Sequence, residues 1–584
     1  MTERPAQDHD TTPAEAGAQP EDRAAHRVRL LSWCAAVFVA AFLTWSARFS
    51  MNPDGISYLD IADSYLHGRW SAALNAYWSP LYSWVLALDL GILKPSAFWE
   101  FPAIQLINFA VFLIALAAFD RFWRAQGERY IHAASAPSDT PSETFPRWAW
   151  LALGYALFIW TIANATVVSQ ITPDLLVAAL VYMIAAILVR IRAGNANIGL
   201  FFFFGFVLGL GYLGKTVMFL LGFVFLGVSF LALRDRRKAV TRLLAALLAF
   251  LLVTTPFIFL ISRSKGRFTF GESGRLGYAW VVNRSAPFFN WQGADPAGGV
   301  PRHTTRKIHS APALYEYASP VSGTYPPHYD PSYWNDGLTP HFHFQQQLRV
   351  IMTSIYASYD ALFLPQSGLI ACALILILLS GSSFVRRFGE NWHLWIPAAA
   401  GFGLYALVTV EPRYVAGLLL MLWAALLSAI RLPRSEQSKK LLAGVTIVAV
   451  LLLSLSVAEK MAIRIYEWKD RSVNLSWQIA DGLRHFGLQQ GDKVASLGAG
   501  YNNHWARTAR LKIVAEIPSS DVGTFWAAGP QIQSDVYAIC ARIGVRAIVA
   551  NEVPRATSAS AWQPIGNTGY YVYLLPPPTA ARPN

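Results

Sequence analysis

The chain has 584 residues, of which 54% are hydrophobic and only 14% are charged, whereas an average soluble domain carries about 25% charged residues. Its net charge of +13 would suit nucleic-acid binding, but the basic residues stand in short loops beside apolar runs, as cytoplasmic loops of membrane proteins do. The composition therefore excludes a soluble nucleic-acid-binding protein and predicts an α-helical polytopic membrane protein.

The N-terminal residues 1–29 are rich in Ala, Pro, Asp and Glu near their start, which predicts a disordered cytoplasmic segment. The apolar run 30–49 is long for a signal-peptide core, so we expect a retained signal anchor. Apolar runs of about 20 residues, enough to cross a bilayer, recur and predict about eleven transmembrane helices, at 30–49, 101–120, 148–166, 174–193, 198–213, 216–233, 240–262, 366–385, 392–410, 414–432 and 441–458.

The basic clusters beside these runs give an orientation. With a cytoplasmic N-terminus, each strong cluster obeys the positive-inside rule; these include Arg27/Arg29, Arg121/Arg124/Arg129, Arg190/Arg192, Arg234/Arg236/Arg237/Lys238, Arg386/Arg387 and Arg431/Arg434/Lys439/Lys440. Counting 77–93 as a further span would break the pattern, so we expect an interfacial or re-entrant helix there, on the outer side. The sequence thus predicts a transmembrane core at 30–262 with an outer loop at 50–100, and C-terminal transmembrane helices at 366–458.

Two large polar pieces fall on the outer side in this topology. Residues 263–365 form a loop rich in aromatic residues, Pro, Gly and His. Residues 459–584 alternate apolar and polar residues as a small α/β domain does. In that domain we expect helices at 475–488 and 530–543 and strands at 493–499, 512–517, 545–550 and 569–575.

Several polar turns between apolar runs share the outer side. They contain Asp54 and Asp60 after the first run, Asp174 in "TPDLL", Lys215 in "GYLGKTVMF", and Glu411, Arg413 and Tyr414 in "VEPRYVAG". A charge at membrane depth costs at least about 2.5–3.5 kcal/mol, so such residues commonly pair, face a cavity or act in a reaction. Each has a simpler alternative: Asp54 as a helix cap, Asp174 as a favourable charge at a helix start, and Lys215 as a side chain that snorkels.

These motifs, in this order, resemble the GT-C superfamily of membrane glycosyltransferases, and most closely the bacterial aminoarabinose lipid A transferases and protein O-mannosyltransferases, which are glycosyltransferase family 39-like. "NPDGISYLDIA" resembles the family's first outer loop, "SPLYSWVLAL" the outer-surface helix after it, and "TPDLL" the Asp-containing turn of the next loop. "LGKTVMFLL" resembles the family's Gly-Lys turn, and "EPRYV" a late Glu-x-Arg-Tyr motif.

The resemblance implies a multi-pass protein of the plasma (inner) membrane with a periplasmic or extracellular C-terminal domain. It implies transfer of a sugar, with inversion, from a polyprenyl-phosphate donor to a hydroxyl of a protein, lipid or polysaccharide acceptor. Asp54 would be the general base, with Asp60 and Asp174 as further catalytic candidates. Lys215 and Arg413 would stabilise the phosphate, and Glu411, Tyr414 and Tyr58 would complete the donor site.

The sequence departs from the family at Gly55, where many members have a second acid. No cofactor is implied with certainty, and a divalent metal is possible. The large insert at 263–365 also differs from compact members. The alternative function is a transporter or flippase, or a non-catalytic assembly protein, for lipid-linked envelope polysaccharide. Polar residues gather at one face of the bundle instead of near the membrane centre, which favours an enzyme over a transporter.

Overall fold

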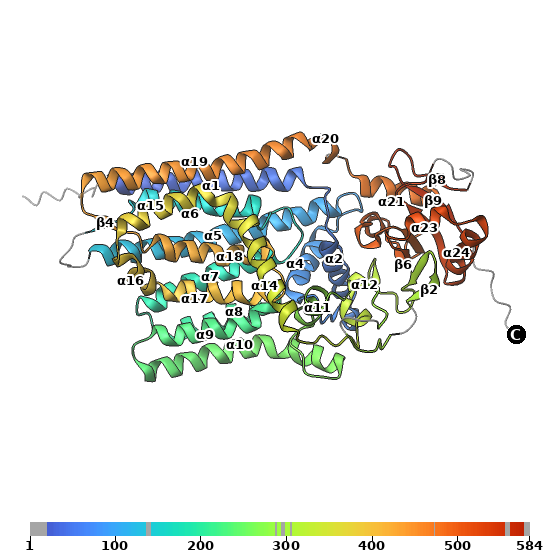
Figure 1. Ribbon diagram of the computed structural model, residues 1–584, viewed down its shortest axis with the longest axis horizontal. Coiled ribbons are helices and arrows are strands. Elements are labelled where there is room, and N and C mark those ends of the chain that lie inside the picture. Colours follow the sequence, from blue (N-terminus) through green and yellow to red (C-terminus); the bar gives the residue numbers. More distant parts are fainter. Residues whose placement is uncertain are drawn as a thin grey trace, which may run out of the picture.

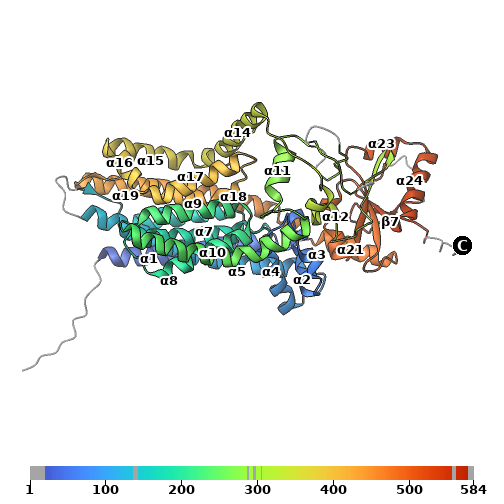
Figure 2. The same ribbon diagram turned by 90° about the horizontal axis from the view of Figure 1, so that it is seen from below.

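The computed structural model describes residues 20–135, 142–285, 289–293, 298–303, 306–471, 473–554 and 561–576. A bundle of long helices and a domain built on a β-sheet occupy opposite ends of an elongated molecule (Figure 1). Short helices fill the layer between these two parts, and a second view shows the same order (Figure 2).

Every apolar run expected to cross the membrane coincides with a helix of the bundle. These helices are α1 (Pro20–Ser46), α5 (Glu100–Ser135), α6 (Arg147–Asn164), α7 (Asp174–Arg192), α8 (Ile198–Gly214), α9 (Val217–Ala232), α10 (Arg236–Lys265), α15 (Ser367–Ser380), α17 (Trp392–Ala406), α18 (Pro412–Leu427) and α19 (Glu436–Tyr466). Among the described residues, six helices are long and apolar enough to span a bilayer by length and composition. The chain is therefore an integral membrane protein with a predominantly helical fold, as predicted.

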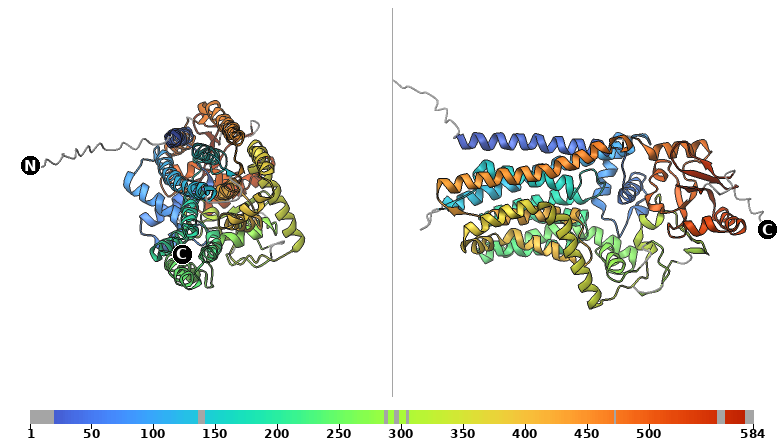
Figure 3. Two further views of the ribbon diagram at one scale, coloured as in Figure 1. Left: turned by 90° about the vertical axis from the view of Figure 1, so that its left-hand side faces the viewer. Right: turned by 45° about the horizontal axis from the view of Figure 1, so that its top comes forward.

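Some helices run well past the apolar segments that predict them. Helix α5 continues to Ser135 and α19 to Tyr466, because the residues that follow each apolar run still favour helix. Figure 3 shows α1 and α19 running side by side along the bundle. The apolar run thus predicts where a helix lies in the membrane but not where the helix ends.

Tight packing within the bundle depends on small residues opposite large ones. The indole rings of Trp123 and Trp150 stack with centroids 4.8 Å apart. Each indole N–H donates to the other residue's backbone carbonyl, at 2.8 and 2.9 Å. A Cβ added at Gly154 would lie 2.1 Å from Trp123 Nε1, so only glycine permits this approach.

The layer between bundle and sheet contains α2 (Pro53–Leu66), α3 (Trp70–Ala73), α4 (Pro80–Leu93), α11 (Ser273–Val281), α12 (Pro326–Tyr329) and α13 (Pro331–Trp334). Helix α4 has 14 residues, too few to cross a bilayer. It packs on α2 through a buried cluster that includes Tyr58, Leu59, Tyr82 and Leu86. This packing fixes α2 at the end of the bundle that faces the sheet domain.

The sheet domain combines the C-terminal residues with part of the insert. Its sheet has the order β2-β3-β6-β5-β7-β9-β8, and β5, β6 and β7 are parallel. The strands are β2 (Lys307–Ser310), β3 (Ala313–Glu316), β5 (Lys493–Leu497), β6 (Lys512–Ile517), β7 (Val545–Ala550), β8 (Gln563–Pro564) and β9 (Tyr571–Leu574).

Helices complete this domain around its buried strands. They are α21 (Leu475–His485), α22 (Trp505–Thr508), α23 (Val522–Ala527) and α24 (Pro530–Arg542). The hairpin β2–β3 comes from the 263–365 insert and pairs antiparallel with β6, with Tyr315 opposite Glu516. The insert and the C-terminal residues therefore share one sheet, an arrangement that the sequence does not predict.

Candidate active site

Asp54 stands in the first turn of α2, directly after Pro53. The N-cap position belongs to Asn52, whose side chain accepts from the backbone N–H of Ile171 at 2.9 Å and donates to its carbonyl at 3.3 Å. Asn52 thus joins the first outer loop to the turn that precedes Asp174. The carboxylate of Asp54 is left to face the bundle, where it is 26% exposed.

Asp54, Asp174, Lys215 and Arg413 lie together in one cluster of alternating charge. Arg413 Nη1 is 3.1 Å from Asp54 Oδ2 and 3.5 Å from Asp174 Oδ2. Lys215 Nζ is 2.5 Å from Asp174 Oδ1. Asp174 is only 2% exposed, while the two cations are each about one-fifth exposed. Asp174 therefore acts as the buried anchor of two cations that still reach solvent or a ligand.

Four helix ends bring these side chains together. Asp54 lies in the first turn of α2, Asp174 begins α7, Lys215 follows the last residue of α8, and Arg413 lies in the first turn of α18. Each residue stands in a turn or in the end of a helix. These charged side chains can gather because the four turns meet at one end of the helical bundle.

Aromatic rings enclose the cluster. The Lys215 ammonium lies 3.3 Å from the centroid of the Tyr414 ring, a cation–π contact that holds the charge without neutralising it. Tyr414 stacks on Tyr405 at 5.2 Å. Tyr58 is 4% exposed and packs edge-on against Trp78 and Tyr82, between α2 and α4. Glu411 is the exposed N-cap residue of α18 and has no ion pair within the described part of the chain.

His328 is a member of the site that the sequence does not indicate. Its Nε2 is 3.7 Å from Asp54 Oδ1, its Nδ1 is 2.8 Å from the Ser57 hydroxyl, and its ring packs on Trp78. Burial lowers the pKa of His328, although the negative charge of Asp54 acts to raise it. The imidazole is therefore neutral near pH 7. It comes from α12 in the insert, where several histidines look alike in the sequence.

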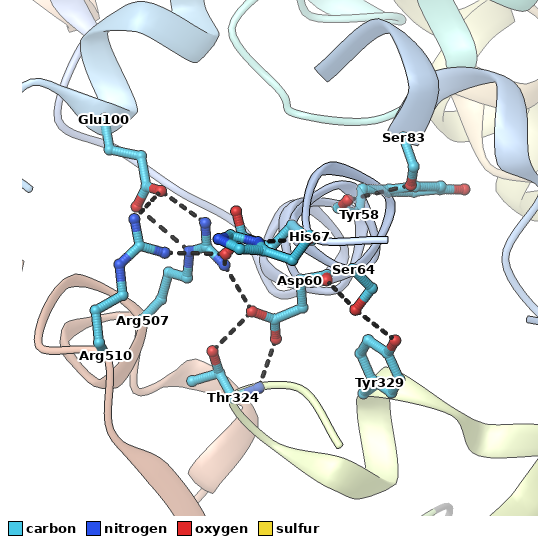
Figure 4. A network of polar contacts seen from close by, with 11 residues as sticks. Tyr58, Asp60, Ser64, His67, Ser83, Glu100, Thr324, Tyr329, Arg507 and Arg510 are labelled. Carbon is cyan, nitrogen blue, oxygen red and sulfur yellow. Dashed lines mark hydrogen bonds and ion pairs between the residues drawn. The ribbon is translucent and has the colours of Figure 1, made fainter. Parts of the chain in front are cut away.

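Asp60 takes part in a different network, with the sheet domain (Figure 4). Its carboxylate pairs with Arg507 at 2.9 Å and accepts from the Thr324 backbone N–H at 2.5 Å and hydroxyl at 3.0 Å. Arg507 also pairs with Asp63 and Glu100, each at 2.6 Å. Since all the polar partners of Asp60 are structural, its place is a tie between α2 and the sheet domain.

A cavity of about 690 Å³ opens beside the charged cluster. Its walls are mainly apolar and come from α9, α11, α17 and the segment between α10 and α11; they include Val217, Leu220, Phe268, Trp280, Leu404 and Leu407. Lys215, Tyr414 and Tyr405 line the same cavity. An apolar chamber with an ammonium group in its wall suits a ligand with an apolar chain and an anionic head.

The cluster does not fit a divalent metal ion. Both carboxylates that face it, Asp54 and Asp174, already pair with cationic side chains, and a metal ion would have to displace Arg413. A second acid beside Asp54 would also require the surrounding side chains to shift, because a Cβ at Gly55 would lie 2.7 Å from Met51 Sδ and 2.8 Å from Ile171 Cβ. The described residues contain no group of three or more Asp, Glu, His and Cys side chains that would hold a metal.

No family model and no curated protein sequence matches the chain. Among solved structures, ArnT from Cupriavidus metallidurans bound to undecaprenyl phosphate matches with a TM-score of 0.53 and 14% identity, over 95% of this chain and 99% of that chain. Its apo state matches with a TM-score of 0.49 and 13% identity, over 93% and 98%. The oligosaccharyltransferase from Archaeoglobus fulgidus in its apo form matches with a TM-score of 0.43 and 12% identity, over 89% and 69%.

At these identities the likeness concerns the fold. It extends over nearly the full length of this chain and of ArnT, and includes both the helical bundle and the sheet domain. The chain therefore has the GT-C fold of membrane glycosyltransferases, as its resemblance to that superfamily predicted.

Proposed function

We propose that the protein is an inverting glycosyltransferase that transfers a sugar from a polyprenyl-phosphate donor to a hydroxyl group of a protein, lipid or polysaccharide acceptor. The observation that carries the proposal is the position of Asp54, Lys215 and Arg413 beside the apolar cavity. A base, two cations and a lipid-sized chamber are the parts that this reaction needs. The solved structure of ArnT with undecaprenyl phosphate supports the proposal through its shared fold.

The donor's polyprenyl chain lies in the apolar cavity, where burial of its surface contributes about 25 cal/mol per Å². Its phosphate lies against Lys215 and Arg413. Arg413 offers a planar fork of N–H donors that matches phosphate oxygens, and Lys215 offers a compact point charge. Tyr414 holds the ammonium of Lys215 from its other side.

Asp54 acts as general base in the transfer. The acceptor oxygen attacks the anomeric carbon, its proton passes to the Asp54 carboxylate, and the bond between that carbon and the phosphate oxygen breaks. The electron pair of that bond leaves with the polyprenyl phosphate, whose growing negative charge Lys215 and Arg413 stabilise. Attack opposite the leaving group inverts the anomeric configuration. No metal ion takes part in any step of this scheme.

Arg413 links the two halves of the reaction. Without donor it pairs with Asp54 and Asp174. A bound phosphate competes with Asp54 for its guanidinium, so Asp54 loses a cationic partner when the donor arrives, which favours proton uptake. Asp174 keeps both cations in place throughout, because it is buried and has no other role in the scheme.

His328 and the membrane orientation complete the proposal. His328 lies against Asp54 and limits the rotation of its carboxylate. The basic clusters support a topology with the N-terminus in the cytoplasm and the sheet domain on the outer, periplasmic side of the plasma membrane. The charged cluster then faces the outer leaflet, where it meets a lipid-linked donor and an acceptor from the outer space.

Release of labelled sugar from a panel of polyprenyl-phosphate sugars tests the proposal. We expect turnover of at least one donor by the purified wild type and by Asp535→Asn, an exposed acid on α24 that serves as control. Asp54→Asn should bind the same donor without turnover. Donor binding with no turnover by the wild type, even with a mixed envelope extract as acceptor, would favour a transporter or assembly role instead.

A further inference from the structure

A second cavity, of about 680 Å³, lies between α2, the insert and the sheet domain. It differs from the first in that its walls are polar. Hydroxyl and amide groups line it, from Ser64, Ser322, Thr324, Tyr329 and Gln490. Charged side chains complete the walls, namely Asp60, Asp63, Arg69, Arg507, Arg510 and Lys512.

Two of the four cations in these walls are fully used by carboxylates. Arg507 pairs with Asp60, Asp63 and Glu100, and Arg510 pairs with Asp63 and Glu100 at 3.1 and 2.9 Å. Burial alone would raise the pKa of the Asp63 carboxyl, but the positive charges of Arg507 and Arg510 lower it. Figure 4 shows both guanidinium groups turned toward Glu100, and that of Arg507 also turned toward Asp60. In this internal network three carboxylates face two guanidinium groups, so neither guanidinium is left to hold an anionic ligand.

The other two cations, Arg69 and Lys512, differ from Arg507 and Arg510 in their ion pairing. Within the described ranges, neither forms an ion pair with a carboxylate, although both line the cavity. Burial lowers the pKa of Lys512, and the positive charges of Arg507 and Arg69 lower it further. The negative charge of Asp60 acts in the opposite direction and raises it. Arg69 and Lys512 thus line one cavity with like charges that repel each other. An anion between them would relieve that repulsion.

We propose that this cavity binds an anionic group, a phosphate or a carboxylate, on a saccharide acceptor, between Arg69 and Lys512. The inference rests on the proposed transferase function. The hydroxyl and amide walls suit a polyhydroxylated ligand and do not suit a lipid chain. Helix α2 connects this site to the reaction, because Asp60 in the cavity wall is six residues from Asp54, about 9 Å along a helix at 1.5 Å per residue.

Binding of fluorescent oligosaccharides to the full-length protein in detergent tests the proposal without requiring turnover. The probes are trigalacturonate, which carries carboxylates, a phosphorylated glucose trimer, and neutral trigalactose. We expect an anionic probe to bind, with a dissociation constant about tenfold weaker in Arg69→Gln and in Lys512→Gln. The control Arg542→Gln changes an exposed cation on α24 and should bind as the wild type does.

The comparison between probes identifies the anion. Preference for the carboxylate or for the phosphate probe assigns the group that Arg69 and Lys512 hold. Equal binding of neutral trigalactose, or equal affinities of all variants, would overturn the proposal. Hydrolysis of the labelled donor requires neither Arg69 nor Lys512. It therefore tests the transferase function separately from the acceptor site. If the donor is turned over normally while no anionic probe binds, the acceptor site is refuted and the transferase function stands.

Discussion

Removal of the Arg507 guanidinium should loosen the sheet domain from the rest of the protein. The side chain is 3% exposed and contacts Asp60, Asp63 and Glu100 at 2.6–2.9 Å. In Arg507→Met, Arg510 still pairs with Asp63 and Glu100, so Asp60 is the carboxylate left without a cation. Loss of one partner from a buried ion pair costs about 3–5 kcal/mol. Thr324 still donates twice to Asp60, so we expect about 3 kcal/mol.

Hydrogen exchange measures this cost locally, because it reports the free energy of opening for each part of a protein. A change of about 3 kcal/mol corresponds to roughly a hundredfold loss of protection, which we expect in β5, β6 and α22. Arg507→Lys should restore part of the protection, since it keeps the charge but not the fork of donors. The exposed Arg542→Met is the matched control. Unchanged protection in Arg507→Met would show that the network does not hold the domains together.

Three further predictions concern the site and the sheet domain. His328→Ala should lower kcat about tenfold with little change in donor KM, because the Asp54 carboxylate loses its neighbour; an unchanged kcat would remove His328 from the site. Burial raises the pKa of Glu516 to about 7, so the folded state holds a proton that the unfolded state loses above about pH 4.5. Stability from this group is therefore lost as pH rises from about 5 to 7, and the melting temperature of Glu516→Gln relative to wild type should rise over that window and then level off. A difference in melting temperature between the two proteins that does not change with pH would contradict the raised pKa of Glu516. Finally, donor turnover should persist in excess chelator, since Lys215 and Arg413 supply the positive charge that the leaving phosphate needs; full loss, restored by a divalent ion, would contradict this charge arrangement.

The helical bundle follows from the sequence because the length of an apolar run is a local property. The strands β5, β6, β7 and β9 follow for the same reason, as each is a short apolar segment between turns. The hairpin β2–β3 does not, because each of its strands has only 4 residues and β2 is largely exposed. Strand β3 pairs with β6, about 200 residues further along the chain, and no local pattern records that partner.

The candidate site shows the same division. Orientation alone indicates that Asp54, Asp174, Lys215 and Arg413 share a side of the membrane, and in the structure they form one cluster. Asp60 looks equivalent to Asp54 in the sequence because both are acids on one helix. Its surroundings are set by a residue 447 positions away, and a single sequence gives no sign of such a contact.

The most direct test compares Asp54→Asn with Asp60→Asn in the same preparation, with labelled-sugar release and hydrogen exchange measured on both. Asp54→Asn should lose 10²–10⁴-fold in kcat, as expected for removal of a general base, and should retain wild-type protection. Asp60→Asn should keep the chemistry when folded but should lose protection where α2 meets the sheet domain. Full turnover by Asp54→Asn would contradict the assignment of Asp54 as the base. A loss of kcat in Asp60→Asn without a loss of protection would contradict the structural role of Asp60.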